Sequence, residues 1–292
     1  NVAAGITTKY HAIAFENDPE EGRTTELAAE LTEAIEAADS WMADHRIHVR
    51  CEVSQEEAVT AAIRDVQREA VDLVSVMSHV PGKGQFADIE AFKQYYETSD
   101  RHTVEEAERF IEERTSVSMS EIRDRVDRVV ERANDAGVVT ASHDDEDPQE
   151  VERLSERGVD IAEYPITLET AKRANELGMT TVMGAPNLVR GESQWGNLTS
   201  MATIGADVLD VLCVDYHPPS LLAAPFVETG EALPKRVARV TKNPADAVGL
   251  TDRGRVEVGA RADLVLVDTA ETPTVTRAFV EGRDVYRAEG DR

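Results

Sequence analysis

Short apolar runs of strand length alternate along this chain with longer stretches in which apolar residues recur at helical spacing. The largely apolar run 71–77 and the alternating polar and apolar run 47–53 both predict strands. Helical spacing over 55–69 predicts a helix between them. By the same patterns, further strands are expected at 4–8, 138–142, 159–164, 180–183 and 209–214, and further helices at 24–43, 148–157 and 168–177. Strands that alternate with helices in this way indicate a parallel sheet covered by helices.

The seven expected strands are one fewer than a closed (β/α)8 barrel of the TIM type contains. The first of them begins a few residues after Asn1. We therefore expect a missing first strand and its helix to precede this chain, since one such unit occupies about 30 residues. The passage 89–136 is rich in Glu and Arg, which predicts helices with a solvated face. The fold class expected is thus α/β, with strands 2 to 8 of a metal-dependent hydrolase barrel over residues 1–250.

The periodicity changes near the end of the chain. Turn and strand signals alternate over 254–268, and a last pair of short strands is expected at 275–280 and 285–286. Strands that follow one another without helices between them predict a small β appendage. We expect residues 251–292 to be the C-terminal part of a small β-sandwich domain.

Histidine and acidic side chains follow several expected strands at their carboxyl ends, namely Glu52, His79, His143 and Asp215. Parallel barrels present their catalytic groups at this end of the strands. Two imidazoles and two carboxylates there predict a site for a divalent metal, most naturally zinc, with a position open for water. Asp215 is the candidate base that takes a proton from that water, and its alternative role is a plain ligand or a helix cap.

Three cations stand nearest to these strand ends, Arg50, Lys83 and Arg190. Lys83 lies between two glycines, a layout whose backbone N–H groups could cradle phosphates, although a simple loop fits it equally well. Arg190 is expected on a loop after the strand 180–183, which is the seventh strand of the complete barrel. Barrels often bind phosphate there, and a surface salt bridge is the alternative role. The three residues are candidate substrate-binding groups for an anionic substrate.

The composition narrows the class of protein. With 292 residues and 41% hydrophobic content the chain can bury an ample core. Cys51 and Cys213 both fall in expected strands, so we expect two small buried core residues rather than a disulfide framework. No apolar run approaches the roughly 20 residues that cross a bilayer, so we expect a cytoplasmic protein. The net charge of −26 with six lysines would repel nucleic acid and anionic membranes. It suggests a halophilic origin, with an acidic mesophilic protein as the alternative.

Particular segments resemble a known family. The segments 241–250, 259–265 and 280–283 resemble the tail of the amidohydrolase superfamily. Further segments resemble one branch of it, the diphosphatases of the phosphonate carbon–phosphorus lyase pathway; these are 48–52, 78–86, 142–145 and, most particularly, 183–191. The resemblance implies metal-dependent hydrolysis of α-D-ribose 1-methylphosphonate 5-triphosphate to the 5-phosphate and pyrophosphate. It also carries Glu52, His143 and Asp215 over as metal positions, with His79 as a further ligand.

The chain departs from the superfamily pattern at two places. The paired histidines after the first strand are absent, in keeping with the expected missing start. Glu163 stands after the sixth strand, where many relatives have a histidine; it is either an oxygen ligand or unused, and His217 has either a chemical role or a solvated position.

Three functions remain open from the sequence. The first is the diphosphatase, whose partner would be a small phosphorylated ribose. The second is another amidohydrolase, a deacetylase or cyclic amidase, with a site less rich in cations. The third is a non-catalytic subunit of a phosphonate-degrading assembly. We expect neither nucleic acid nor membrane as a partner, and homo-oligomerisation stays open.

Overall fold

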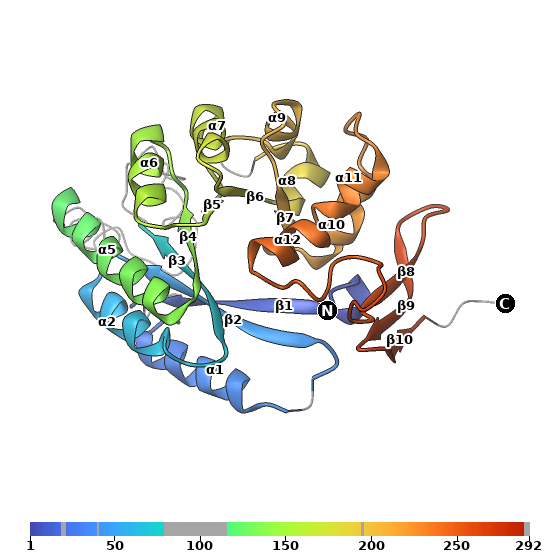
Figure 1. Ribbon diagram of the computed structural model, residues 1–292, viewed down its shortest axis with the longest axis horizontal. Coiled ribbons are helices and arrows are strands. Elements are labelled where there is room, and N and C mark those ends of the chain that lie inside the picture. Colours follow the sequence, from blue (N-terminus) through green and yellow to red (C-terminus); the bar gives the residue numbers. More distant parts are fainter. Residues whose placement is uncertain (19–21, 40, 79–115, 194–195, 289–292) are drawn as a thin grey trace. The chain divides into compact units, whose positions relative to one another are not determined.

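The computed structural model describes residues 1–18, 22–39, 41–78, 116–193 and 196–288 (Figure 1). The chain divides into two compact units. The first comprises residues 12–37 and 47–179, and the second comprises residues 1–11, 38–46 and 180–292.

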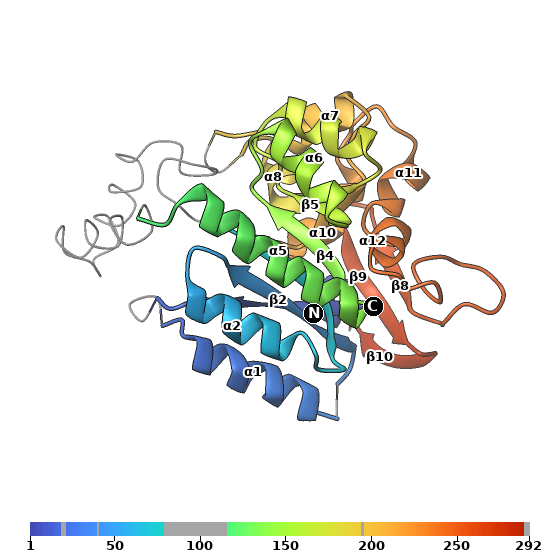
Figure 2. The same cartoon turned by 60° about the vertical axis from the view of Figure 1, so that its left-hand side comes forward.

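The first unit is a parallel α/β structure. Its strands follow one another in the sheet in chain order, and they are β1 (Thr8–Phe15), β2 (Asp44–Glu52), β3 (Val71–Met77), β4 (Val139–His143) and β5 (Ile161–Glu163). The first residues of β1 and β2, up to His11 and Arg46, belong to the second unit. From β2 to β5 each neighbouring pair is parallel. The helices are α1 (Thr25–Ala37), α2 (Glu56–Asp65), α5 (Met119–Ala136), α6 (Pro148–Glu156) and α7 (Leu168–Glu176). Figure 2 shows α1, α2 and α5 side by side along the strands.

Alternation along β2 separates a packed face from a polar face. Val49 and Cys51 are fully buried and belong to the same apolar cluster as Val126 and Val129 of α5. Successive strand residues point to opposite faces. His48, Arg50 and Glu52, which alternate with Val49 and Cys51, therefore share the face that points away from α5. The apolar half of the pattern therefore anchors the strand, and the polar half is left for chemistry.

The second unit combines a parallel pair of strands with a small antiparallel sheet. The strands β6 (Thr180–Gly184) and β7 (Val211–Cys213) are parallel, and the antiparallel sheet has the order β10 (Arg283–Arg287), β9 (Thr274–Val280), β8 (Leu264–Asp268). Its helices are η1 (Val2–Ala4), α8 (Ala185–Arg190), α9 (Ser200–Gly205), α10 (Pro218–Ala223), η3 (Ala224–Phe226), α11 (Leu233–Ala238) and α12 (Lys242–Ala247).

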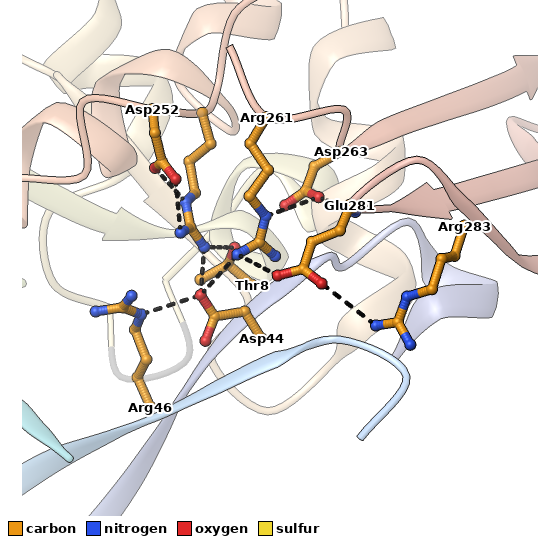
Figure 3. Close-up of polar contacts among 9 residues, drawn as sticks. Thr8, Asp44, Arg46, Asp252, Arg261, Asp263, Glu281 and Arg283 are labelled. Carbon is orange, nitrogen blue, oxygen red and sulfur yellow. Dashed lines mark hydrogen bonds and ion pairs between the residues drawn. The ribbon is translucent and has the colours of Figure 1, made fainter. Parts of the chain in front are cut away.

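Within the second unit, Asp44 is hydrogen-bonded to arginines that are far apart in the sequence (Figure 3). Its Oδ2 accepts hydrogen bonds from Arg46 Nε at 3.2 Å, from Arg261 Nη1 at 3.4 Å and from Arg253 Nη1. Arg253 also donates to Thr8 Oγ1 at 3.1 Å. Burial alone would raise the pKa of Asp44, but Arg253 and Arg46 outweigh it and hold the pKa below its ordinary value. The cluster joins the segments around Thr8 and Asp44 to the C-terminal part of the chain.

Several expected elements are present with shifted ends, whereas three expectations are wrong. The strand expected at 4–8 instead begins at Thr8, because Gly5, with φ 82°, closes a short 3-10 turn before it. No strand forms over 254–258, where Val256 and Val258 are 91% and 107% exposed. Arg190 ends the helix α8 rather than lying on a loop.

Other expectations hold in the described residues. The strand expected at 71–77 has those bounds, and the last pair of strands is present as β9 and β10. Neither Cys51 nor Cys213 is in a disulfide, and Cys51 is buried as predicted, whereas Cys213 is only partly buried. The helical passage is present as α5, and its part before residue 116 lies outside the described residues. No helix in the described part of the chain is long and apolar enough to cross a membrane. The domain boundary at residue 250 stays a prediction.

Candidate functional site

Strand register places a group of polar side chains on one face of the first unit. Arg50 pairs with Ser75 on β3, and Ser75 pairs with Ala141 on β4. At the carboxyl end of the next pair, His143 lies opposite Glu163 of β5. Because side chains of paired residues point to the same face of a sheet, these residues lie on the face that also carries His48.

Hydrogen bonds connect the members of this strand-end cluster, which consists of His48, Arg50, Ser75, His143 and Glu163. Ser75 Oγ donates to Glu163 Oε2 at 2.8 Å, and His48 Nε2 is in hydrogen-bond contact with Ser75 Oγ. His143 Nδ1 lies 3.3 Å from the same Glu163 oxygen, and Arg50 Nη2 lies 3.2 Å from His143 Nε2. A cation, two imidazoles, a hydroxyl and a carboxylate are thus linked in one largely buried chain of contacts.

The charges in the cluster follow from burial and neighbours. Burial alone would raise the pKa of Glu163, but His48, His143 and Arg50 outweigh it and lower the pKa to about 2. Burial is the main reason that the pKa of His48 is lowered to about 4, so this imidazole is neutral at neutral pH. Burial would also lower the pKa of His143, but Asp144 and Glu163 outweigh it and raise the pKa above its ordinary value. The carboxylate of Glu163 is therefore ionised at neutral pH.

Strained backbone follows both strands that end in the cluster. Asp144 and Tyr164 come directly after β4 and β5, and both have left-handed φ angles, 59° and 54°. Non-glycine residues adopt this conformation at a cost of about 1 kcal/mol or more, and such strain is concentrated at functional sites. It turns the chain sharply where His143 and Glu163 end their strands. The ring of Tyr164 lies edge-on against His143, with ring centres 5.2 Å apart.

Two aspartates flank the cluster on the β4 side. Asp144 Oδ2 lies 3.7 Å from His143 Nε2, and this buried oxygen has no hydrogen-bond partner among the residues described. Burial raises the pKa of Asp145 to about 6, although Ser142 donates a hydrogen bond to it. A buried carboxylate oxygen beside an imidazole is a donor pair that suits a divalent cation.

The candidate metal ligands are only partly brought together within the first unit. His143 belongs to the cluster, and Glu52 is fully buried on the same face of β2, where its Oε1 accepts a hydrogen bond from the Ser54 N–H at 3.1 Å. His79 and the candidate phosphate ligand Lys83 lie outside the described residues. No group of three or more metal-ligating side chains forms among the residues described. The donor types present nevertheless fit a divalent ion, since imidazole and carboxylate are its usual ligands.

The remaining candidates lie in the second unit. Arg190 donates from Nη1 to the Tyr216 hydroxyl at 2.8 Å, so it contacts the residue that follows Asp215. Asp215 has φ 53°, the same left-handed conformation that follows β4 and β5. His217 precedes α10, and its Nδ1 is 2.8 Å from Ser220 Oγ, a contact that satisfies this ring nitrogen locally.

Two members of the cluster, His48 and Ser75, were not among the predicted site residues. His48 had a signal, since it alternates with Arg50 and Glu52 and therefore shares their face. Ser75 had none, because a serine within an apolar strand is usually a core residue. Only the register with β2 and β4 shows its place.

Sequence comparisons relate the chain to characterised proteins. The model of the Amidohydrolase family matches residues 216–285. Alpha-D-ribose 1-methylphosphonate 5-triphosphate diphosphatase of Escherichia coli K12 is 37% identical over 294 aligned positions, which cover 98% of this chain and 78% of that protein. Adenine deaminase of Methanothermobacter thermautotrophicus is 33% identical over 110 positions, which cover 35% of this chain and 20% of the deaminase. The first of these relatives matches almost all of the chain, whereas the deaminase matches a limited part.

Structural comparisons identify the architecture. Dihydropyrimidinase from Brevibacillus agri superposes with a TM-score of 0.60 at 11% identity, and a D-hydantoinase with 0.52 at 13% identity. Each match covers 98% of this chain and 78% of the other. At this level of identity the likeness shows the fold alone. It confirms the predicted α/β barrel architecture with a small C-terminal β-sheet.

Proposed function

The chain belongs to the amidohydrolase family and is a hydrolase, and we propose that it cleaves α-D-ribose 1-methylphosphonate 5-triphosphate to the 5-phosphate and pyrophosphate in phosphonate catabolism. The 37% identity to the diphosphatase over 98% of the chain supports this substrate. The observation that carries the proposal is the contact between Arg50 and His143, 3.2 Å apart at the carboxyl ends of parallel strands. It places a cation beside a candidate metal ligand, as hydrolysis of an anionic phosphate ester requires.

We propose that Glu52, His79, His143 and Asp215 hold a divalent ion, and that this ion is zinc. When bound, such an ion supplies a water of lowered pKa and polarises a phosphoryl oxygen. Glu163 is a further candidate ligand, because its carboxylate is ionised and adjoins His143. The His143 Nε2 lone pair now accepts a hydrogen bond from Arg50, so a ligand at that atom would require Arg50 to turn away.

The other residues would bind the substrate and move protons. Arg50, Lys83 and Arg190 are the proposed ligands of the polyphosphate, and Asp215 is the proposed base that takes the proton from the attacking water. Arg50 also separates this function from the amidase alternative. A site for a neutral cyclic amide has no need of a guanidinium in contact with its histidine, whereas a triphosphate does.

We further propose a cytoplasmic protein that works at high salt and binds neither nucleic acid nor membrane. The net charge of −26 supports this proposal, because a surface so acidic repels other polyanions. Its self-repulsion is screened over a Debye length of about 3 Å at 1 M salt.

Asp215→Asn tests the proposed chemistry against a control with the same backbone. Asp207 has φ 59°, close to the 53° of Asp215, and asparagine adopts this conformation readily, so Asp207→Asn is the matched control. With the zinc-loaded protein and the ribose triphosphate, we expect pyrophosphate release to fall by about 100-fold or more in Asp215→Asn and to stay unchanged in Asp207→Asn. Equal rates in the two variants would contradict the role of Asp215, and no release by the unaltered protein would contradict the function.

A further inference from the structure

We propose that Ser75 and His48 are positioning residues, which hold the carboxylate of Glu163 in a fixed orientation. In this orientation one carboxylate oxygen, Oε1, is available to a bound ligand or a water at the reacting centre. The inference rests on the proposed function in one respect, that Glu163 acts at the reacting centre. Neither His48 nor Ser75 touches the substrate in this account, and each acts through Glu163.

The direction of each hydrogen bond follows from the number of protons available. Ser75 Oγ donates its single hydroxyl proton to Glu163 Oε2, which lies 2.8 Å away. Ser75 Oγ then has only lone pairs to offer His48, and His48 Nε2 must donate to it. A neutral imidazole carries one proton, so the hydrogen bonds from His48 to Ser75 and from Ser75 to Glu163, here called the relay, fix the tautomer of His48 with that proton on Nε2.

The same reasoning applies to the other imidazole. Arg50 can only donate, so its contact with His143 places the acceptor at Nε2, and Nδ1 is the nitrogen that faces Glu163 Oε2. Oε2 of Glu163 therefore receives two hydrogen bonds, one from Ser75 and one from His143. Its other oxygen, Oε1, receives none from the described residues. The relay thus assigns one oxygen to support and leaves the other for a ligand or a water.

The geometry of the sheet is arranged so that this contact can form. Ser75 lies on β3 and Glu163 on β5, so their hydrogen bond reaches across the intervening strand β4. The residue of β4 in register with Ser75 is Ala141, whose methyl group is fully buried. A larger side chain at that position would fill the space that the Ser75 and Glu163 side chains use.

The hydrogen bonds of Ser75 and His48 assign them to the support of Glu163. Ser75 is fully buried and His48 is 7% exposed. A nucleophilic serine must reach the substrate, and this hydroxyl is enclosed within the sheet with its proton committed to Glu163. Support of a reacting carboxylate by a buried hydrogen-bonded partner is the role that remains.

Ser75→Ala removes the link without adding bulk, and Thr181→Val is its matched control. Thr181 is also a fully buried strand residue, and its hydroxyl has no hydrogen-bond partner among the residues described. Three readouts separate positioning from general stability. They are the tautomer of His48 from long-range ¹H–¹⁵N NMR, the zinc affinity from competition with a chelator, and kcat and KM for pyrophosphate release.

In the unaltered protein we expect His48 to be neutral with its proton on Nε2. In Ser75→Ala we expect part of the His48 population to move its proton to Nδ1, and zinc affinity or kcat to fall by about 10- to 100-fold with little change in KM. Thr181→Val should change none of these. A proton on Nδ1 of His48 in the unaltered protein, or unchanged zinc affinity and kcat in Ser75→Ala, would overturn the proposal.

The first two readouts need no turnover. If the unaltered protein releases no pyrophosphate, the proposed function fails, and the tautomer and zinc affinity of Ser75→Ala still decide whether Ser75 positions Glu163.

Discussion

Burial and one or two neighbouring groups determine whether a buried side chain in this protein is charged and whether that charge is compensated. Glu163 stays ionised deep in the sheet because imidazoles and a guanidinium surround it. Arg239, only 2% exposed, is likewise compensated by one partner, since Glu231 accepts from its Nη2 at 2.9 Å and also from its Nη1. At such positions the loss of one group leaves its partner as an uncompensated buried charge, which is costly.

Arg50→Lys tests the contribution of the guanidinium to substrate binding. Lysine keeps the charge but lacks the planar fork that can bond His143 and a phosphate together. We expect kcat/KM for the triphosphate to fall about 10-fold, which corresponds to about 1.4 kcal/mol, mainly through a higher KM. Arg64→Lys, at an arginine whose side chain is 64% exposed, should have no effect. Equal kinetics for the two variants would contradict a role of Arg50 at the site.

Glu231→Gln tests the buried pair with Arg239. The hydrogen bond from Arg239 is the largest cause of a pKa lowered to about 2 at Glu231. A lowered pKa in the folded state means that the carboxylate stabilises the fold above its ordinary pKa of 4.5, and that this stability is lost as the pH falls toward 2. We expect Glu231→Gln to lower the free energy of unfolding at pH 7 by about 3 kcal/mol, measured by urea denaturation, with a smaller difference near pH 3. A difference that does not shrink on acidification would contradict this ionic role.

Helices and strands here are set by local signals of very different strength. Serine at position 118 and Glu121 form a complete capping box, so the start of α5 is marked in the sequence. Pro186 at the start of α8 and Gly191, with φ 82°, at its end are also helix signals, and they outweigh the loop expected around Arg190.

Ser118→Ala tests how far this cap stabilises its helix. The Ser118 side chain accepts the N–H of Glu121 at 3.2 Å, and its loss leaves that donor without a partner. We expect the free energy of unfolding to fall by about 1 kcal/mol, measured by urea denaturation. Glu131→Ala, an exposed substitution in the middle of the same helix, is the control and should cost nothing measurable. Equal stability of Ser118→Ala and the control would contradict the capping role.

Apolar periodicity predicts elements well where burial decides them, and poorly where it does not. The strand 71–77 is buried along most of its length, and its bounds follow from the apolar run alone. Val256 and Val258 have the same residue type, yet they are exposed in a segment without a strand, because no neighbouring strand covers them. In the candidate site, Arg50 and His143 were predicted from their strand-end positions. Ser75 was not, since its role depends on the register of three strands.

The whole chain carries far more acidic than basic side chains, and it places its arginines accordingly. Asp44 pairs with three arginines in the second unit, of which Arg46 and Arg261 are labelled in Figure 3. The third, Arg253, has a side chain only 8% exposed. Asp44 is the carboxylate that these arginines share, although Arg253 also pairs with Asp252 and Arg261 with Asp263. Some of the chain's cations thus lie in buried clusters, whereas others, such as Arg64 and Arg287, are exposed.

Asp44→Asn tests this cluster as a determinant of stability. The change leaves Arg253 and Arg261 without their shared carboxylate, and we expect the free energy of unfolding to fall by about 2 to 3 kcal/mol. Asp284 also accepts from two arginines, Arg277 and Arg287, but at an exposed site, so Asp284→Asn is the control and should cost much less. Urea denaturation measures both. A loss no larger for Asp44→Asn than for the control would contradict the role of the buried cluster.

The products formed from the ribose triphosphate show whether this chain is a diphosphatase. The zinc-loaded protein at high salt would be mixed with α-D-ribose 1-methylphosphonate 5-triphosphate and followed by ³¹P NMR. We expect pyrophosphate and the 5-phosphate in equal amounts, with loss of both on addition of a chelator. Orthophosphate as the first product, or an unchanged triphosphate in the presence of metal, would contradict this activity.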